Sequence, residues 1–94
     1  MLKVHFSKQF RKDLARIRKR GLKEKKLDTV VLILAEGKTL PPKYRDHALV
    51  ISRDYKNLRE CHIEPDWLLV YRIENDELTL ILARTGSHSD LFGK

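Results

Sequence analysis

The sequence predicts an α+β domain in which a helical hairpin packs on one face of an antiparallel sheet with one mixed edge. Apolar residues recur at helical spacing in the first third of the chain, and short runs typical of strands follow from residue 47 onward. The order strand, helix, helix and then consecutive strands belongs to the α+β class. A chain of 94 residues suffices for one core, so we expect residues 1–94 to form a single domain.

The first strand and the two helices are each marked by their own pattern. Residues 2–6 alternate apolar and polar side chains, and Ser7 is a suitable N-cap for a helix that runs to Arg20. A second helix is expected from Leu22 to Glu36. The buried faces are given by apolar residues at near-helical spacing: Phe6, Phe10, Leu14 and Ile17, then Leu27, Val30, Val31 and Leu34. Gly21 alone separates the helices, which predicts an antiparallel hairpin.

The second half of the chain predicts strands separated by turns. The expected order is a loop at residues 40–46, a short strand at 47–51, a hairpin at 59–73 that turns at 64–66, a strand at 78–84, and a loop or short helical turn at 85–90. Pro41 and Pro42 cannot continue the second helix, so the loop begins there. Residues 68–73 are apolar on both faces, which indicates a central strand.

The net charge of +7 is concentrated at the N-terminal end. Residues 1–26 carry 11 lysines and arginines and 2 carboxylates, whereas residues 27–94 carry 9 and 11. A positive field of this kind attracts polyanions, so nucleic acid or an acidic protein is the expected partner. Charge alone leaves a second interpretation open, in which the basic helix face only keeps the protein soluble.

A single cysteine and the lack of long apolar segments indicate the compartment. Cys61 has no partner for an internal disulfide, which fits a reducing cytoplasm and excludes a zinc site made of thiolates. The start of the chain is charged, so we expect no signal peptide. The longest apolar run, residues 30–35, is too short to cross a bilayer. We expect a cytoplasmic protein without a membrane partner.

Three of the four histidines lie in loops or at strand ends, close in sequence to other polar residues. RNA carries its own nucleophile, the 2′-hydroxyl, so its cleavage needs a base, an acid and cations that stabilise the charged phosphorane, without a metal ion. The chain offers groups for each task. The candidates are His47, His62, Asp66 and His88 for proton transfer, Arg84, Lys43 and Arg59 for binding phosphate, and Trp67, Tyr44 and Phe92 for stacking on bases.

These residue types also have other interpretations. A single loop histidine is more often a solvated side chain, Asp66 after Pro65 is a common turn residue, and a tryptophan such as Trp67 is more often part of a core. The three loop histidines with Asp66 are also of the right types for a metal site. No HxH or HxxxH pair supports such a site, so we expect neither a metal ion nor a cofactor.

Three blocks of the sequence resemble the YafQ-like branch of the RelE/ParE toxin superfamily. They are residues 44–49 (YRDHAL), residues 59–71 (RECHIEPDWLLVY) and residues 84–93 (RTGSHSDLFG), in this order and at this spacing. The basic helical hairpin and the Leu-Pro exit after it also match, so the resemblance covers nearly the whole chain. It implies the compact α+β fold of these toxins.

Members of that branch are toxins of bacterial type II toxin–antitoxin systems. The resemblance implies a metal-independent endoribonuclease that cleaves mRNA on the translating ribosome, and a cognate antitoxin that silences it. It also implies that the basic N-terminal third binds ribosomal RNA and an acidic antitoxin segment, and that operator DNA is contacted only through the antitoxin. Carried over to this chain, the family's functional set falls on His47, His62, Asp66, Trp67, Arg84, His88 and Phe92.

For the roles of these residues we expect His88 to be the general acid and Asp66 the general base, with His62 as the alternative base. His47 would hold substrate or stabilise charge, and Arg84 would bind the scissile phosphate. A second hypothesis is a non-catalytic toxin or binding module of the same fold, either gyrase-directed like ParE or RNA-binding. The three loop histidines with Asp66 favour the nuclease, because binding alone does not need proton transfer.

Overall fold

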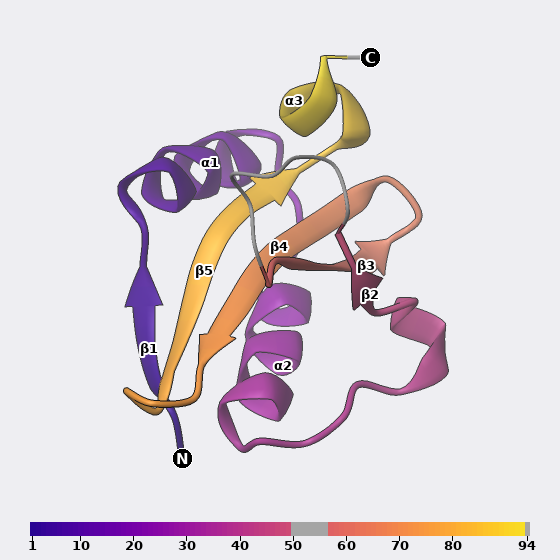
Figure 1. Cartoon of the computed structure of the whole chain (residues 1–94). Helices are drawn as coiled ribbons and strands as arrows, with labels where there is room; N and C mark the ends of the chain where they lie inside the picture. The colour runs from indigo at the N-terminus through magenta and orange to yellow at the C-terminus, as the bar shows by residue number, and fades with distance from the viewer. Residues whose placement is uncertain (50–56, 94) are drawn as a thin grey trace.

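The computed structural model of the chain describes residues 1–49 and 57–93, and its elements follow the predicted order (Figure 1). They are β1 (Lys3–Phe6), α1 (Lys8–Lys19), α2 (Glu24–Ala35), the 3-10 helix η1 (Pro42–Tyr44), β2 (His47–Ala48), β3 (Arg59–Glu64), β4 (Trp67–Glu74), β5 (Thr79–Gly86) and α3 (His88–Phe92). Among the described residues, no helix is both long enough and apolar enough to cross a membrane.

A five-stranded sheet in the order β1-β5-β4-β3-β2 forms the centre of the protein (Figure 1). The strands β2 to β5 are antiparallel neighbours, and β1 runs parallel to β5 at one edge. The predicted α+β class with one mixed edge is therefore confirmed. The middle strand is β4, as its apolar residues indicated: Leu68 and Leu69 point to opposite faces and both are fully buried.

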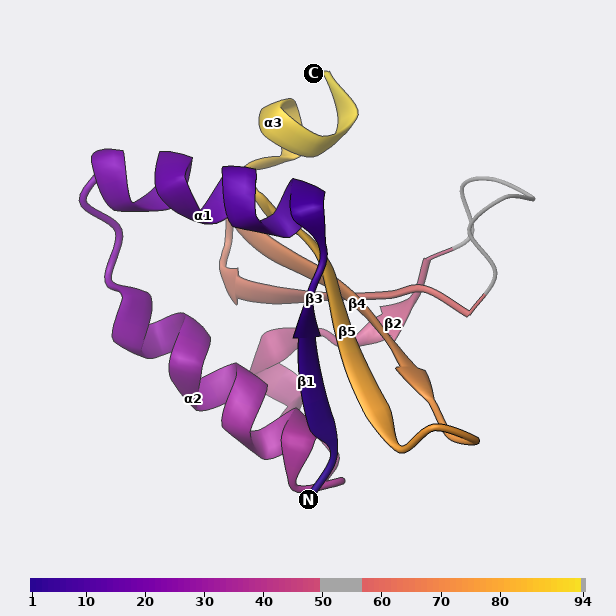
Figure 2. The same cartoon turned by 90° about the vertical axis from the view of Figure 1, so that its left-hand side faces the viewer.

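Both long helices lie on the same side of the sheet (Figure 2). The hydroxyl of Ser7 accepts the backbone N–H of Phe10 at the start of α1 and donates to the carbonyl of Ala83 on β5, so the N-cap also fixes the helix to the sheet. The core between helices and sheet includes Phe10, Ile17, Leu27, Val30, Leu34, Cys61, Ile63, Trp67, Leu69, Tyr71, Leu80 and Leu82.

The helical hairpin is more open than predicted. Residues 20–23, not Gly21 alone, connect α1 to α2. From this connection the two helices diverge across the sheet (Figure 2), α1 against β5 and α2 against β3. Each helix thus buries its apolar stripe on the sheet and not mainly on the other helix. Gly21 has a φ of +75°, a left-handed conformation that favours glycine, and this turns the chain between the helices.

Two details of the sequence prediction were wrong. Phe6 belongs to β1 and is 40% exposed, so it is not part of the buried helix face, because the helix begins only after Ser7. The short strand predicted at residues 47–51 is reduced to His47–Ala48 among the described residues. Its last two predicted residues, 50 and 51, lie outside the described part of the chain.

Two irregularities in strand pairing set the directions of polar side chains near one end of the sheet. Pro65 and Asp66 form the tight turn between β3 and β4, and the register shifts between His62 and Glu64. A proline has a negative φ, which excludes the mirror-image turns that keep a hairpin regular. A second shift places Ala83 and Arg84 together opposite Val70. Such a bulge redirects the side chains that follow it.

Candidate active site

Three histidines from three segments of the chain form one cluster. The ring centroid of His62 on β3 lies 6.2 Å from that of His47 on β2 and 5.7 Å from that of His88 on α3. Phe92 extends the row, with its ring centroid 6.5 Å from that of His88. The three segments singled out by the sequence therefore meet in space, while the roles of their side chains stay predictions.

Asp66, at the tip of the β3–β4 hairpin, holds His88 in place. One carboxylate oxygen, Oδ1, accepts the backbone N–H of His88 at 2.9 Å and its ring Nδ1–H at 2.6 Å. The backbone hydrogen bond and then the ring hydrogen bond lower the pKa of Asp66 from its ordinary value. Because Nδ1 carries the proton shared with Asp66, Nε2 is the ring nitrogen left for exchanging protons with a substrate.

The position of His88 is fixed by the cap of a short helix. The hydroxyl of Ser87 accepts the backbone N–H of Asp90, and the Asp90 carboxylate accepts the backbone N–H of Ser87, which completes a capping box. Gly86 precedes the cap with a φ of +153°, and a Cβ there would lie 2.9 Å from the Asp90 side chain. Glycine is thus required at this junction, and His88 becomes the first residue of α3.

Glu60 is a residue of the site that the sequence analysis missed. Its side chain is only 7% exposed, and its Oε1 lies 3.4 Å from Nε2 of His62 and 3.6 Å from Nε2 of His47. One buried carboxylate therefore lies between two histidines of the cluster. The signal in the sequence was the spacing: residues two apart on a strand share a face, so Glu60 and His62 point the same way.

A separate polar network supports His47. Its Nδ1 donates to the carbonyl of Arg45 at 2.7 Å, which fixes the tautomer and directs Nε2 toward Glu60. The preceding residue, Asp46, accepts the hydroxyl of Tyr71 at 2.6 Å and pairs with Arg59, whose Nη2 lies 3.2 Å from Asp46 Oδ2. Burial, and then the hydrogen bond to Asp46, raise the pKa of Tyr71. Arg59, predicted to bind phosphate, thus holds the segment before His47.

Arg84 is anchored by a second missed residue, the fully buried carboxylate of Asp13 on α1. Arg84 donates from Nε at 2.7 Å and from Nη2 at 3.2 Å to the two oxygens of Asp13, which also accepts the backbone N–H of Thr85 at 3.1 Å. Asp13 lies on the same helical face as Phe10 and Ile17. A charged residue within an apolar stripe was the signal that could have revealed it.

Arginine and aspartate side chains alternate from Asp13 to α3. Nη1 of Arg16 lies 3.5 Å from Asp13 and 3.7 Å from Asp90, and Arg20 donates to both carboxylate oxygens of Asp90. The hydrogen bond from Arg20 holds the pKa of Asp90 far below its ordinary range. This ion-pair chain, Arg84–Asp13–Arg16–Asp90–Arg20, fixes both Arg84 and the helix that carries His88 to α1.

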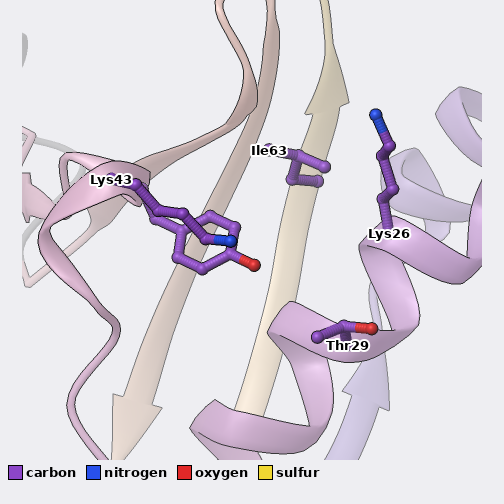
Figure 3. Close-up of a pocket in the computed structure, with 5 residues that line it drawn as sticks. Lys26, Thr29, Lys43 and Ile63 are labelled. Carbon is purple, nitrogen blue, oxygen red and sulfur yellow. The ribbon is translucent and has the colours of Figure 1, made fainter.

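The remaining predicted site residues lie in different environments. Trp67 is 2% exposed and donates its indole N–H to the hydroxyl of Thr85 at 2.9 Å, so it is a core residue whose ring faces are covered. Phe92 is 37% exposed beside the histidines. Lys43 and Tyr44 lie in η1 and line a hollow between this turn, β3 and α2 (Figure 3).

Within the described residues, one group of side chains has the geometry of a metal site. Ligand atoms of Glu60, His62 and His88 lie within 4.8 Å of one another. This set differs from the one considered from sequence, since Glu60 takes the place of His47 and Asp66. Cys61 is not part of it: burial raises the pKa of its thiol to about 12, so the thiolate that metals and nucleophilic catalysis require is disfavoured.

Comparison with known proteins gives one consistent family. Residues 2–93 match the family described as the bacterial toxin of type II toxin–antitoxin systems, YafQ. The mRNA interferase toxin YafQ of Escherichia coli (strain B / BL21-DE3) is 40% identical over 91 residues, which cover 96% of this chain and 95% of the relative.

Two solved structures are similar over almost their whole length. A metal-bound toxin from Helicobacter pylori is 50% identical with a TM-score of 0.89, covering 98% of this chain and 100% of that one. The E. coli DinJ–YafQ complex contains a chain that is 37% identical with a TM-score of 0.88, covering 99% and 100%. Two E. coli relatives are named mRNA interferases, which are endoribonucleases, and this chain belongs to the YafQ family of bacterial type II toxin–antitoxin toxins.

Proposed function

We propose that this protein is the toxin of a type II toxin–antitoxin system and cleaves mRNA on the translating ribosome in the cytoplasm. The attacking group is the 2′-hydroxyl of the RNA, which displaces the 5′-oxygen of the next nucleotide without a metal ion. Family membership supports the substrate class. The observation that carries the proposal is the contact between His88 and Asp66 within a cluster of three histidines, because this arrangement suits proton transfer.

His88 acts as the general acid in this proposal. Asp66 accepts the hydrogen bond of Nδ1–H, which leaves Nε2 to donate a proton to the leaving 5′-oxygen. The His88 side chain is 46% exposed, which leaves it accessible to a substrate strand. The carboxylate also stabilises the cationic ring that must exist before the proton is given up.

We assign the role of general base to His62 and not to Asp66. Asp66 already accepts two hydrogen bonds from His88, and its lowered pKa makes it a weak base near neutral pH. The ring of His62 lies next to that of His88, with Glu60 behind it. We therefore assign Asp66 to orienting His88 and His62 to accepting the proton of the 2′-hydroxyl.

Arg84 supplies positive charge for the phosphorane, and His47 holds substrate or stabilises charge beside it. Arg84 is held by Asp13 at the end of β5, and its guanidinium can bind phosphate with N–H donors in a fixed plane. His47 donates from Nδ1 to a backbone carbonyl and presents its other nitrogen on the side of Glu60. Preorganised donors of this kind stabilise charge that develops only in the transition state.

A cognate antitoxin is the proposed protein partner. The related toxin YafQ of E. coli has been solved in complex with DinJ. The basic residues of α1 and α2 suit an acidic antitoxin segment as well as ribosomal RNA, and operator DNA would be reached only through the antitoxin.

Primer extension on mRNA from bacteria that express the toxin tests the proposal. We expect discrete cuts in register with the reading frame from the wild type, and none from His88→Ala. The variant should retain the wild-type thermal unfolding midpoint, because the His88 ring is half exposed. Growth arrest with intact mRNA would favour the gyrase-directed or RNA-binding alternative. A toxic His88→Ala variant that still cuts mRNA would refute the role of His88 as the acid.

A further inference from the structure

Two neighbouring hollows at the edge of β3 share lining residues, and one of them is lined by His62. One has a volume of about 240 Å³ and is lined by Lys26, Thr29, Lys43, Tyr44 and Ile63. The other has the same volume and is lined by Lys43, Arg45, His62, Ile63, Glu64 and Pro65. Lys43 and Ile63 belong to both hollows. Together the two hollows extend from His62 past η1 to α2, and we call the pair the η1 groove.

The walls of the η1 groove come from segments far apart in the sequence. Figure 3 shows Lys26 and Thr29 on α2 across from Lys43, with Ile63 on β3 between them. Ile63 is 8% exposed and gives this part of the groove an apolar floor. The groove extends the candidate site because His62 lines one of its two hollows. Its lysines are not among the residues described above as holding the histidines.

The chemistry of the groove suits an anionic ligand with flat apolar parts. Lys26, Lys43 and Arg45 supply three cations, against one carboxylate, Glu64, which lies 3.0 Å from Nζ of Lys26. Nζ of Lys43 lies 5.1 Å from the ring centroid of Tyr44, so a cation and an aromatic face occur together. Cations that follow a phosphate backbone, combined with an aromatic ring for a base, are typical of single-stranded RNA sites.

We infer that the η1 groove binds nucleotides of the substrate RNA strand next to the phosphate that is cleaved. The inference rests on the proposed function and adds the path of the strand away from the histidines. A phosphate lies between Lys26 and Lys43, and the neighbouring base lies against Tyr44 after the flexible Lys43 side chain turns toward the phosphate. An acidic protein segment would match the charges but would not use the aromatic ring or the continuity with His62.

The salt dependence of RNA binding tests the two lysines. We would measure fluorescence anisotropy of a short, labelled, fully 2′-O-methylated RNA, which cannot be cleaved, with the wild type, Lys26→Ala, Lys43→Ala and Lys25→Ala. Lys25 is exposed on the same helix and does not line the groove, so its variant is the matched control. The logarithm of the binding constant falls linearly with the logarithm of the salt concentration. Each groove variant should make this negative slope shallower by about 0.7, the value for one phosphate contact on a single strand. The control should leave the slope unchanged.

Substitution of Tyr44 tests the base contact separately from charge. Tyr44→Phe keeps an aromatic face and should bind the RNA as the wild type does. Tyr44→Leu should weaken binding roughly tenfold, within the range measured for losing one base–aromatic stack. Thermal unfolding of both variants checks that they are folded. RNA affinities are then compared for folded protein only.

The outcomes separate this inference from the proposed function. If wild type cuts mRNA but the groove variants bind RNA with the wild-type slope and affinity, the groove inference is overturned and the nuclease stands. A loss of affinity for a poly-glutamate peptide with unchanged RNA binding would likewise overturn it and assign the groove to an acidic protein. A reduced slope in Lys26→Ala and Lys43→Ala alone, with weaker binding of Tyr44→Leu, would support it.

Discussion

Oδ1 of Asp66 accepts two N–H groups of one residue, the backbone N–H of His88 at 2.9 Å and its ring Nδ1–H at 2.6 Å. The two residues are 22 positions apart in the sequence, one at a hairpin tip and the other at the start of a helix. A single carboxylate oxygen therefore fixes both the backbone position and the ring orientation of the proposed acid.

Replacing this carboxylate should reduce cleavage without removing it. Asp66→Asn keeps an oxygen that can accept a hydrogen bond but loses the charge that stabilises the cationic ring. We expect single-turnover mRNA cleavage on ribosomes to fall by roughly tenfold or more, but less than the 10²–10⁴-fold effect typical of losing a general acid. The cleavage rate of His88→Ala, measured in parallel, should fall further and gives the size of the loss when the acid itself is removed. An Asp66→Asn variant as fast as the wild type would remove Asp66 from the mechanism.

The pH dependence of cleavage should distinguish the two candidate bases. The pKa of Asp66 is lowered, so Asp66 stays ionised above its ordinary value of 3.8 and titrates only as the pH falls further. If Asp66 is the base, the rate should not rise with pH between pH 5 and 7. A histidine base would instead give a rate that rises with pH before the loss of the acid's proton lowers it, and His62→Gln should abolish that rise. Profiles of the wild type and His62→Gln, each from pH 5 to 8, decide the assignment.

The pair between Asp90 and Arg20 should make stability sensitive to acid. The folded-state pKa of Asp90 is depressed, so its contribution is fully present above the unfolded value and is lost as the pH falls through the folded value. In urea unfolding, wild type should exceed Asp90→Asn in unfolding free energy at pH 6, and the gap should narrow progressively as the pH falls below about 4. A gap as large at pH 2 as at pH 6 would show that shape, not charge, is responsible.

Asp13 should matter for both stability and activity. Removing one partner of a buried ion pair leaves the other charge without compensation, so Asp13→Ala should lower the free energy of unfolding by about 3 kcal/mol. Asp13→Asn should unfold less readily than Asp13→Ala and still cleave more slowly than wild type, because Arg84 is less firmly held. Asp28→Asn, an exposed carboxylate on α2, is the control and should change neither quantity. Asp13→Asn with wild-type cleavage would limit Asp13 to folding.

Trp67 should act through packing. Its ring is buried and its N–H is bonded to Thr85, so Trp67→Ala should destabilise the fold by about 3–5 kcal/mol. Trp67→Phe should cost less, because most of the ring volume remains and only the hydrogen bond is lost. Chemical denaturation of both variants checks the order. Reduced cleavage by Trp67→Phe with wild-type stability would instead indicate a direct contact with RNA.

A bound metal ion should inhibit the enzyme. Glu60, His62 and His88 offer ligand atoms within 4.8 Å, and imidazole ligands favour ions such as Ni²⁺ and Cu²⁺. Because an ion there would occupy two histidines proposed to move protons, added Ni²⁺ should slow cleavage. Treating the purified toxin with EDTA, which is removed before ribosomes are added, should leave the rate unchanged. Glu60→Gln should weaken Ni²⁺ binding in calorimetry. A rate that falls after this treatment of the toxin alone would overturn the metal-independent mechanism.

Much of the architecture could be predicted because it depends on local patterns. The apolar spacing of Phe10, Leu14 and Ile17 requires a helix with one buried face, and the turn at Pro65 and Asp66 is set by residues adjacent in sequence. The sequence prediction failed where the apolar spacing of one element continued past the end of that element. Phe6 fits the helical spacing, but Ser7 begins the helix one residue later and leaves Phe6 on the edge strand.

The hydrogen-bond and ion-pair partners of the site residues could not be predicted from local sequence patterns. Arg59 and Trp67 have side chains suited to RNA, yet Arg59 pairs with Asp46 and Trp67 with Thr85. Those contacts depend on which strands are neighbours and on the register between them.

The sequence by itself determined the α+β class, the central strand and the three segments that carry the histidines, because short-range spacing and turn chemistry encode them. Only the tertiary structure decided that Asp66 holds His88, that Glu60 lies between His47 and His62, and that Asp13 anchors Arg84. A hydrogen bond requires its donor and acceptor atoms to lie about 3 Å apart. Folding alone brings groups from distant parts of the chain within that range.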